Sequence, residues 1–539
     1  MSFDKLRGGF YTPESLVRIC LDRIVSLNGH KEDLAILEPS LGDGAFLRGV
    51  VTHPIAANVH KFVGLEIANS EAEKSRTVAR QVPFHTSVLT VSAIEWSSKS
   101  NQLFDVVVGN PPFVRYQFVP EEDYESTRRL ADRLGFSFAG VSNLWIPILV
   151  GALARLHPEG HFAMVVPAEL FTGVSAGVVR EWLLMHFNKL QADMFEPGSF
   201  PGVLQEVIVL SGTRLPDAAP SLGGPRRITL IEHGTGSQRH RWSHTVPIGR
   251  GNWTRYLLNA EQLEALVEAT TLSSFRRFSD VAKLEVAIVT GANEYFSVTD
   301  AEATVYDLRQ WADPLLPRMR HAKGLVYTRR DHKETLAGGT RAWLLNFSEN
   351  RPDPGGNARA RKYLHFGEQR GLHRRYKTSI RTPWYRVPHV RDGQLMMSKR
   401  SHRFPRLVRN RAGVVTTDTI YRGWMQPEYA KLQSALVAGF HNSLTLLTGE
   451  VEGRSFGGGV LELVPSEIAR LTVPILEDMG DELSRLDNVA RSSTDKGREE
   501  DLIEATDKLL HERIRGYSQY LDTLRSAREA LAKRRLSRN

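Results

Sequence analysis

The sequence predicts an α/β fold for residues 1–240, followed by an α+β domain over 241–481 and a helical segment over 482–539. Three observations support this prediction. Short apolar runs alternate with helical patterns in the first part, periodicity fades in the second, and apolar residues repeat at helical spacing near the end. Alternating strands and helices are typical of a mostly parallel sheet with helices on both faces.

The α/β prediction rests on two sets of segments that follow one another along the chain. The runs expected to form buried strands are Ala35–Leu37, Phe62–Leu65, Phe104–Val108, Phe162–Val166, Val207–Leu210 and Ile228–Ile231. The segments between them that are expected to form helices are 45–51, 70–80, 144–156 and 175–187.

The C-terminal part carries a different pattern. Arg, His, Pro, Tyr and Trp become frequent over 245–480, which predicts an irregular domain with a basic surface. Farther on, five apolar residues repeat at spacings of four and three: Leu510, Ile514, Tyr517, Leu521 and Leu524. Such a seam is expected to pack on the rest of the chain, with a partner helix as the alternative.

Composition excludes several classes of protein. The 539 residues are 41% hydrophobic and 24% charged, which is ordinary for a globular protein of two to four domains. No apolar run is long enough to span a bilayer, and no signal-peptide pattern is present. The single cysteine, Cys20, excludes an intramolecular disulfide and is expected in the core. We therefore expect a cytoplasmic protein with no metal site and no membrane partner.

Positive charge is concentrated in one stretch. The chain carries a net charge of +9, but residues 351–410 alone hold 16 Lys and Arg against 3 Asp and Glu, or +13. A local excess of this size indicates a polyanionic partner.

A glycine-containing turn, Leu37–Gly44, follows a predicted strand and opens a predicted helix. Glycines there permit a tight turn and close approach of a ligand to the backbone. Glu66 lies 22 residues after Gly44, at the end of the next strand, where a carboxylate can accept hydrogen bonds from both ribose hydroxyls. The arrangement predicts a nucleoside cofactor.

Acidic residues in this turn indicate which cofactor binds. Glu38 and Asp43 would repel a pyrophosphate but suit a ligand with a sulfonium and an α-amino group, which favours S-adenosylmethionine over NAD. The alternatives are that Glu38 is a loop or capping carboxylate and that Glu66 is a solvated strand end.

The strand from Phe104 ends in Asn110-Pro111-Pro112-Phe113. Proline lacks an N–H and has a fixed φ, so two in succession stiffen the turn and leave carbonyls free. One such carbonyl and the Asn110 side-chain oxygen can hold both hydrogens of a planar NH₂ group, directing its lone pair toward a methyl group. Phe113 offers a face on which an extruded base can stack. The alternative is a simple turn after a strand.

The order of these motifs resembles the gamma class of DNA amino-methyltransferases, the TaqI-like adenine-specific enzymes. The resemblance implies a class I S-adenosylmethionine-dependent methyltransferase fold, Rossmann-like, with a mostly parallel seven-stranded sheet. It also implies that Asn143-Leu144-Trp145 lies beside the adenine pocket and that Phe200 stacks on the flipped base, as Phe113 does. The residues that it assigns to the cofactor are Phe10, Tyr11, Thr12, Pro13, Glu38, Ser40, Gly42, Asp43, Gly44, Glu66, Ser92, Ala93, Asn110 and Pro112.

Two positions depart from the family pattern. The family has an acid after the third strand that contacts the cofactor's adenine amino group, and here Ser92 falls at that place, with Glu95 nearby. Phe113 replaces the commoner tyrosine, which removes a hydroxyl and keeps the stacking face.

Basic and aromatic residues interleave in the predicted C-terminal domain. Lys and Arg would neutralise phosphates there, and some Arg would contact guanine edges. The alternative is a solvated basic surface. The residues expected to bind DNA are Arg359, Arg361, Lys362, Arg374, Arg375, Lys377, Trp384, Arg386, Lys399 and Arg400.

These observations predict a site-specific methyltransferase that acts on N6 of a flipped adenine in double-stranded DNA. The resemblance further implies a bacterial, monomeric enzyme that protects host DNA beside a separate restriction endonuclease. The alternatives are methylation of another planar NH₂ (N4 of cytosine, an RNA base or protein glutamine) and a catalytically silent DNA-binding specificity module.

Overall fold

The structure is a computed structural model. It describes residues 11–29, 31–114, 121–141, 143–196, 199–200, 206–216, 224–234, 238–388, 390–456, 458–496 and 498–537. The chain divides into two compact units, one running through Ala260 and one from Glu261 to Ser537. No described helix is both long and apolar enough to cross a membrane.

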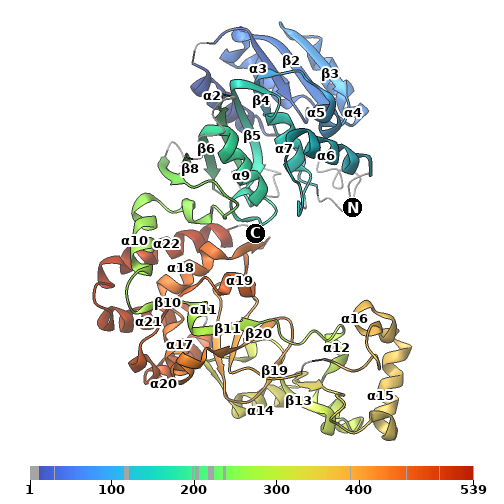
Figure 1. Ribbon diagram of the computed structural model, residues 1–539, viewed down its shortest axis with the longest axis vertical. Helices are drawn as coiled ribbons and strands as arrows, with labels where there is room; N and C mark the ends of the chain where they lie inside the picture. The colour runs from blue at the N-terminus through green and yellow to red at the C-terminus, as the bar shows by residue number, and fades with distance from the viewer. Residues whose placement is uncertain are drawn as a thin grey trace. The chain divides into compact units, whose positions relative to one another are not determined.

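The first unit is built on a nine-stranded mixed sheet of order β3-β2-β1-β4-β5-β7-β6-β8-β9, two strands more than the seven expected (Figure 1). The strands β3, β2, β1, β4 and β5 are parallel, whereas β7 is antiparallel to both of its neighbours. The strands are β1 (Leu34–Glu38), β2 (Val59–Glu66), β3 (His85–Thr90), β4 (Phe104–Gly109), β5 (Leu156–Pro167), β6 (Phe187–Phe195), β7 (Val207–Arg214), β8 (Arg226–His233) and β9 (Arg239–Val246).

Helices cover both faces of this sheet, as the alternation predicted. Successive strand residues point to opposite faces, so Ile36 and Val106 belong to one apolar core and Leu37 and Val107 to the other. The first core is closed by α2 (Glu14–Asn28), α3 (Ala45–Thr52) and α4 (Asn69–Ala79). The second core is closed by α5 (Ala93–Lys99), α6 (Glu121–Leu134), α7 (Trp145–Leu153) and α9 (Gly177–His186). Cys20, on α2, is fully buried in the first core, as expected.

The second unit, from Glu261 to Ser537, is an irregular combination of small sheets and helices. Its larger sheets have the orders β11-β20-β16-β18-β14 and β12-β15-β13-β19. Their strands are β11 (Ala282–Glu285), β12 (Ser297–Val298), β13 (Ala312–Leu316), β14 (Val326–Tyr327), β15 (Trp343–Leu345), β16 (Leu395–Ser398), β18 (Leu407–Asn410), β19 (Val415–Thr416) and β20 (Ile420–Met425). Smaller sheets join β10 (Phe275–Arg277) to β23 (Thr472–Pro474), and β17 (Arg400–Ser401) to β22 (Val460–Glu462) and β21 (Arg454–Phe456).

Helices complete the second unit. The main ones are α10 (Ala260–Thr270), α14 (Arg329–Ala337), α15 (Ala358–Gln369), α16 (Tyr376–Ser379), α17 (Gln433–Gly439), α18 (Ser443–Glu452), α20 (Leu483–Lys496), α21 (Glu500–Arg513) and α22 (Ser518–Leu536). Within this unit, α15 and α16 lie at the end opposite to α20–α22 (Figure 1). All five residues of the predicted seam, from Leu510 to Leu524, are buried, because α22 packs on α18 and α20 on α21.

Candidate active site

The carboxyl ends of β1, β2 and β4 meet where the strand order reverses. From β1 the order runs through β2 to β3 on one side and through β4 to β5 on the other. Ligands of open α/β sheets bind in the crevice at such a point. Because Glu38 ends β1, Glu66 ends β2 and Asn110 follows β4, the fold brings the predicted cofactor and chemical residues to one edge of the sheet.

The turn after β1 is held by the carboxylate of Glu66. Its Oε2 accepts a hydrogen bond from the Gly42 amide at 2.9 Å, and its Oε1 accepts one from the Ala68 amide at 2.8 Å. Gly42 and Gly44 have φ of +54° and +84°, a region that favours glycine, and Gly44 caps α3. Each carboxylate oxygen has a second lone pair, so Glu66 can position the turn and still accept hydrogen bonds from a ligand.

Glu38 is a buried carboxylate that lacks a full set of partners. It is 1% exposed, and its Oε2 has no hydrogen-bond partner among the residues that the structure describes. Burial raises the pKa of Glu38 well above its usual value, and the negative charges of Asp43 and Glu66 raise it further. The positive charge of Arg48 lowers this pKa but does not cancel the other effects. The buried Ser40 hydroxyl likewise has no partner within the described part of the chain. The turn therefore offers hydrogen-bond acceptors to a ligand, and a cationic ligand would favour the charged form of Glu38.

These groups fit a cationic nucleoside. Buried polar atoms are nearly always hydrogen-bonded, so unsatisfied acceptors at a strand switch point mark a place for ligand donors. Glu38 and Ser40 can accept hydrogen bonds from an amino group, and Glu66 can accept them from ribose hydroxyls. Asp43 forms an ion pair with Arg48 at 2.6 Å, so its negative charge is partly neutralised.

The loop after β4 presents Asn110 in a defined orientation. Its side-chain Nδ2 donates to the Thr12 hydroxyl at 3.1 Å, whereas its Oδ1 is buried without a partner among described residues. The Thr12 contact thus leaves the oxygen as the free acceptor. Gly109 has φ of +154°, and a Cβ there would lie 3.2 Å from Pro39, so glycine lets β4 pass close to the cofactor turn. Pro111 is buried, and Pro112 and Phe113 are half-buried.

The N-terminal residues Tyr11, Thr12 and Pro13 lie at the same edge. Thr12 contacts Asn110, and Pro13 precedes the first turn of α2. Tyr11 is 63% exposed, and Lys74 of α4 donates to its hydroxyl at 3.2 Å. Phe10, also expected to bind the cofactor, lies outside the described residues.

Ser92 and Ala93 lie where β3 meets α5. The Ser92 hydroxyl donates at 2.7 Å to Asp123, a buried carboxylate on α6. Glu95, the nearby alternative, instead forms an exposed ion pair with Lys99 at 2.6 Å, which lowers the pKa of Glu95. Asp123 is thus an acid beside the predicted adenine position that sequence reasoning missed, because it reaches this place from a helix 31 residues farther along the chain.

The two predicted stacking residues both pack against the first apolar core. Phe113 also contacts the second core, and Phe200 packs edge-on against Phe195 with ring centroids 4.9 Å apart. Trp145 begins α7 and Asn143 lies two residues before it, and the Leu144 amide between them donates to the Val114 carbonyl at 2.8 Å. This bond ties the start of α7 to the chain just after Phe113.

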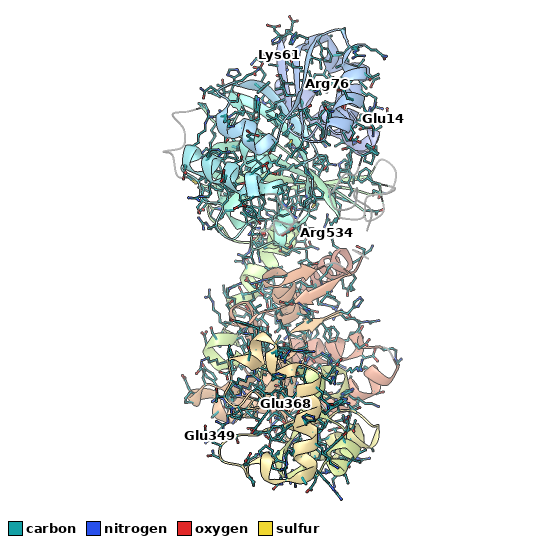
Figure 2. The ribbon with its side chains drawn as sticks, turned by 90° about the vertical axis from the view of Figure 1, so that its right-hand side faces the viewer. Glu14, Lys61, Arg76, Glu349, Glu368 and Arg534 are labelled. Carbon is teal, nitrogen blue, oxygen red and sulfur yellow. The ribbon has the colours of Figure 1, made fainter. Side chains whose placement is uncertain are left out.

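Six of the predicted DNA-binding cations form a basic surface on the second unit, on and around α15 and α16. We call this set the α15–α16 surface: Arg359, Arg361, Lys362, Arg374, Arg375 and Lys377. All six are exposed, and none forms an ion pair with a described carboxylate. Tyr376, also 75% exposed, lies among them, and Figure 2 looks onto α15, where Glu368 is labelled.

The other four predicted DNA-binding residues are differently placed. Arg386 pairs with Glu349 at 2.5 Å, Arg400 pairs with Glu462, and Lys399 is half-buried beside β17. Trp384 packs in an aromatic cluster with Tyr295, their ring centroids 5.5 Å apart, and donates to Glu368 at 3.3 Å.

Two family models match this chain. The model "Eco57I restriction-modification methylase" matches residues 56–195, and "Type II methyltransferase M.Eco57I, C-terminal domain" matches residues 250–511. The chain belongs to the Eco57I-type restriction-modification methylases. This Eco57I-type methylase is a type II DNA methyltransferase of a restriction-modification system, and its cofactor is S-adenosylmethionine.

One curated relative covers most of the Eco57I-type methylase. This relative is the type II methyltransferase M.AccI of Acinetobacter calcoaceticus. The two sequences are 21% identical over 482 residues, which cover 85% of this chain and 84% of that protein. Among solved structures, the type IIG restriction endonuclease BpuSI aligns with a TM-score of 0.43 and 14% identity, over 98% of this chain and 66% of that one. The DrdV–DNA complex aligns with a TM-score of 0.49 and 12% identity, over 89% and 57%.

Proposed function

We propose that this methylase transfers a methyl group to N6 of an adenine flipped out of double-stranded DNA. The observation that supports this most directly is Asn110, whose buried Oδ1 lacks a partner among described residues while Thr12 occupies its Nδ2. An acceptor held in this way suits a planar NH₂ group, whose hydrogens need acceptors.

The residues of the loop define the chemistry in this proposal. Asn110 Oδ1 and the carbonyl beside it in Pro111 accept the two N6 hydrogens, which pulls nitrogen toward a tetrahedral geometry and frees its lone pair. The cofactor supplies an electrophilic methyl group on its sulfonium. Positioning and electrostatics then account for most of the rate increase.

Base stacking accounts for the flipped geometry. A base that leaves the duplex loses its stacked neighbours and needs an apolar face in their place. Phe113 and Phe200 are half-buried and pack on the same apolar core, so part of each side chain remains accessible at this edge. We assign the stacking role to both rings.

On the cofactor side, we assign the ribose hydroxyls to Glu66 and the amino-acid end to Glu38 and Ser40. The Ser92–Asp123 pair supplies the acceptor for the adenine amino group, because Asp123 is a buried acid where the family pattern has one. The α15–α16 surface contacts DNA phosphates. A separate restriction endonuclease recognising the same sequence completes the proposed system.

The test is to incubate the protein with labelled S-adenosylmethionine and genomic DNA and to map modified bases by single-molecule sequencing. We expect N6-methyladenine at one sequence motif. Asn110→Ala should lower kcat by about a thousandfold, the size seen when one preorganised polar group is removed, and should change cofactor affinity little. Label on cytosine, RNA or protein alone would overturn the proposal.

A further inference from the structure

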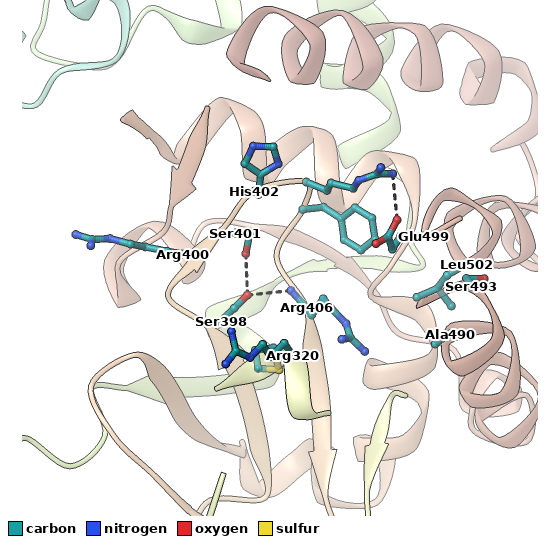
Figure 3. A pocket seen from close by; sticks show the side chains of 13 residues that line it. Arg320, Ser398, Arg400, Ser401, His402, Arg406, Ala490, Ser493, Glu499 and Leu502 are labelled. Atoms are coloured by element: carbon teal, nitrogen blue, oxygen red, sulfur yellow. Dashed lines mark hydrogen bonds and ion pairs between the residues drawn. The ribbon is translucent and has the colours of Figure 1, made fainter. Parts of the chain in front are cut away.

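A cavity of about 430 Å³ lies within the second unit, and none of the α15–α16 surface residues lines it (Figure 3). One wall is the segment from Ser398 to Arg406, which leaves β16, passes through β17 and enters β18. The other walls are Met319 and Arg320 on one side and residues of α20 and α21 on the other. Its volume falls within the range of roughly 300–1,000 Å³ that ligand pockets occupy.

The lining of this cavity is strongly basic. Arg320, Arg400, Arg403 and Arg406 line it, against the single acid Glu499. That acid is already paired with Arg403 at 3.1 Å, and Arg400 pairs with Glu462. Arg320 and Arg406 form no ion pair with any carboxylate in the described part of the chain, although the charges of Asp487 and Glu499 act on Arg406 from a longer distance.

Arg406 is held in place without using all of its donors. Its Nη2 donates to the carbonyl oxygens of Lys323 at 2.9 Å and Gly324 at 2.8 Å. Its Nε and Nη1 have no acceptor among described residues. Burial lowers the pKa of the Arg406 guanidinium to about 10, because the loss of water outweighs the opposing effect of the Asp487 and Glu499 charges.

Hydroxyl groups extend this set of donors. Ser401 and Ser398 are hydrogen-bonded to each other at 2.8 Å, and the Ser398 oxygen also accepts from the Arg406 amide at 3.2 Å. Ser493 of α20 lines the cavity with a buried hydroxyl that has no partner within the described residues. Because buried polar groups are nearly always hydrogen-bonded, the free Ser493 hydroxyl indicates a ligand in the cavity, and Glu499 Oε2, which also makes no hydrogen bond, can accept one from the same ligand.

We propose that this cavity binds a phosphate group through Arg320, Arg406 and Ser493. The planar guanidinium matches phosphate oxygens in a bidentate geometry, and a phosphate supplies the negative charge and the acceptors that the lining lacks. The volume also admits a sugar attached to the phosphate. The same chemistry has two sources, the backbone of DNA and a free nucleoside phosphate. Only the first source rests on the DNA substrate of the proposed function.

The experiment compares Arg320→Gln with a matched control in the full-length protein. Arg320 is exposed, and its replacement removes one charge from the cavity with little effect on folding. Arg330→Gln is the control, since Arg330 is 89% exposed, lies on α14 outside the cavity and is paired with Glu334 at 3.0 Å. Circular dichroism establishes that both variants are folded. Arg406→Lys, which keeps the charge but loses the planar fork, tests the geometry.

The two sources are separated by two titrations. In the first, duplex DNA is titrated at several salt concentrations, which gives the salt slope, the slope of the logarithm of the binding constant against the logarithm of the salt concentration. Loss of one phosphate contact should lower the magnitude of this slope by about one and weaken binding about fivefold at 0.15 M salt. In the second, calorimetry measures the binding of inorganic phosphate and deoxycytidine monophosphate. A change for Arg320→Gln in the first titration identifies a DNA phosphate. A loss confined to the second identifies a free nucleoside phosphate.

The proposal is overturned if both titrations are unchanged in folded Arg320→Gln and Arg406→Lys. This result is distinguishable from failure of the proposed function. A protein that methylates adenine but shows no effect of either substitution refutes the cavity alone. A protein that loses deoxycytidine monophosphate binding on Arg320→Gln but methylates no adenine refutes the proposed function alone.

Discussion

The carboxyl edge of the first unit's sheet and the α15–α16 surface of the second unit carry opposite kinds of unpaired groups. At the edge, Glu38 Oε2, Ser40 Oγ and Asn110 Oδ1 are buried acceptors without partners among described residues. On the α15–α16 surface, six exposed cations lack carboxylate partners in the described structure. By contrast, the buried carboxylate of Asp193 is paired with Arg23 at 2.6 Å and hydrogen-bonded to His233 at 2.7 Å.

The two regions differ in what an unpaired group costs. A buried acceptor without a hydrogen bond costs about 1–3 kcal/mol, so the edge is destabilised until a ligand of matching shape supplies donors. An exposed cation is solvated by water and costs little, and it binds a polyanion by releasing counterions. The edge is therefore suited to selecting one small ligand, and the α15–α16 surface to binding DNA in a salt-dependent way.

The sharpest test of the edge is Glu66→Ala. The substitution removes the proposed ribose acceptor and also the acceptor of the Gly42 and Ala68 amides, so we expect cofactor affinity to fall about a hundredfold, on the scale of two hydrogen bonds to a charged group. Calorimetry with S-adenosylmethionine measures this change. Glu95→Ala, which removes an exposed acid from α5, is the matched control and should bind normally. Equal affinity of both variants would mean that the ribose lies elsewhere.

The α15–α16 surface is tested by replacing Arg374 and Arg375 together with glutamine. Two lost phosphate contacts should lower the salt slope by about two and weaken duplex binding roughly thirtyfold at 0.15 M salt. Methylation at saturating DNA should persist. Arg386→Gln, which removes a cation already paired with Glu349, should change the slope by less than one. If the double variant keeps the wild-type slope, the surface is merely solvated.

The smallest expected effect concerns the buried charge of Glu38. Burial raises the pKa of Glu38, so the folded state favours the neutral form, and the stability of the protein without cofactor decreases as pH rises from the usual carboxyl pKa through the raised one. Glu38→Gln should therefore raise Tm of the cofactor-free protein by about 2–4 °C at neutral pH, corresponding to about 1 kcal/mol. It should also weaken S-adenosylmethionine binding about tenfold.

Thermal unfolding at two pH values checks the origin of this stabilisation. The difference in Tm between Glu38→Gln and the wild type should shrink at pH 4.5, where Glu38 is protonated in the folded state. A difference that does not depend on pH would attribute the gain to packing and not to the buried charge. Glu95→Gln, at an exposed acid paired with Lys99 on α5, is the control and should not raise Tm.

Much of the fold followed from local pattern, and the errors have physical causes. All six predicted strand runs lie in strands, because a sheet covered on both faces requires apolar residues throughout. The edge strand β3 was missed because its residues are largely polar. Strand β6 was missed because it begins at Phe187, directly after α9 ends at His186, with no loop residue between them to mark the boundary. Helix α18 was missed because all but its last residue are buried, which leaves no polar face to show a helical period.

By itself, the sequence determined which chemical groups stand at the ends of β1, β2 and β4, because parallel strands bring their carboxyl ends to one edge. Only the tertiary structure decided which of those groups keep a free atom. Thr12 orients Asn110 across 98 residues, Asp123 meets Ser92 from another helix, and the partners of Arg386 and Arg400 lie 37 and 62 residues away. Pairing of this kind depends on contacts distant in the chain, which local patterns of apolar and charged residues do not encode.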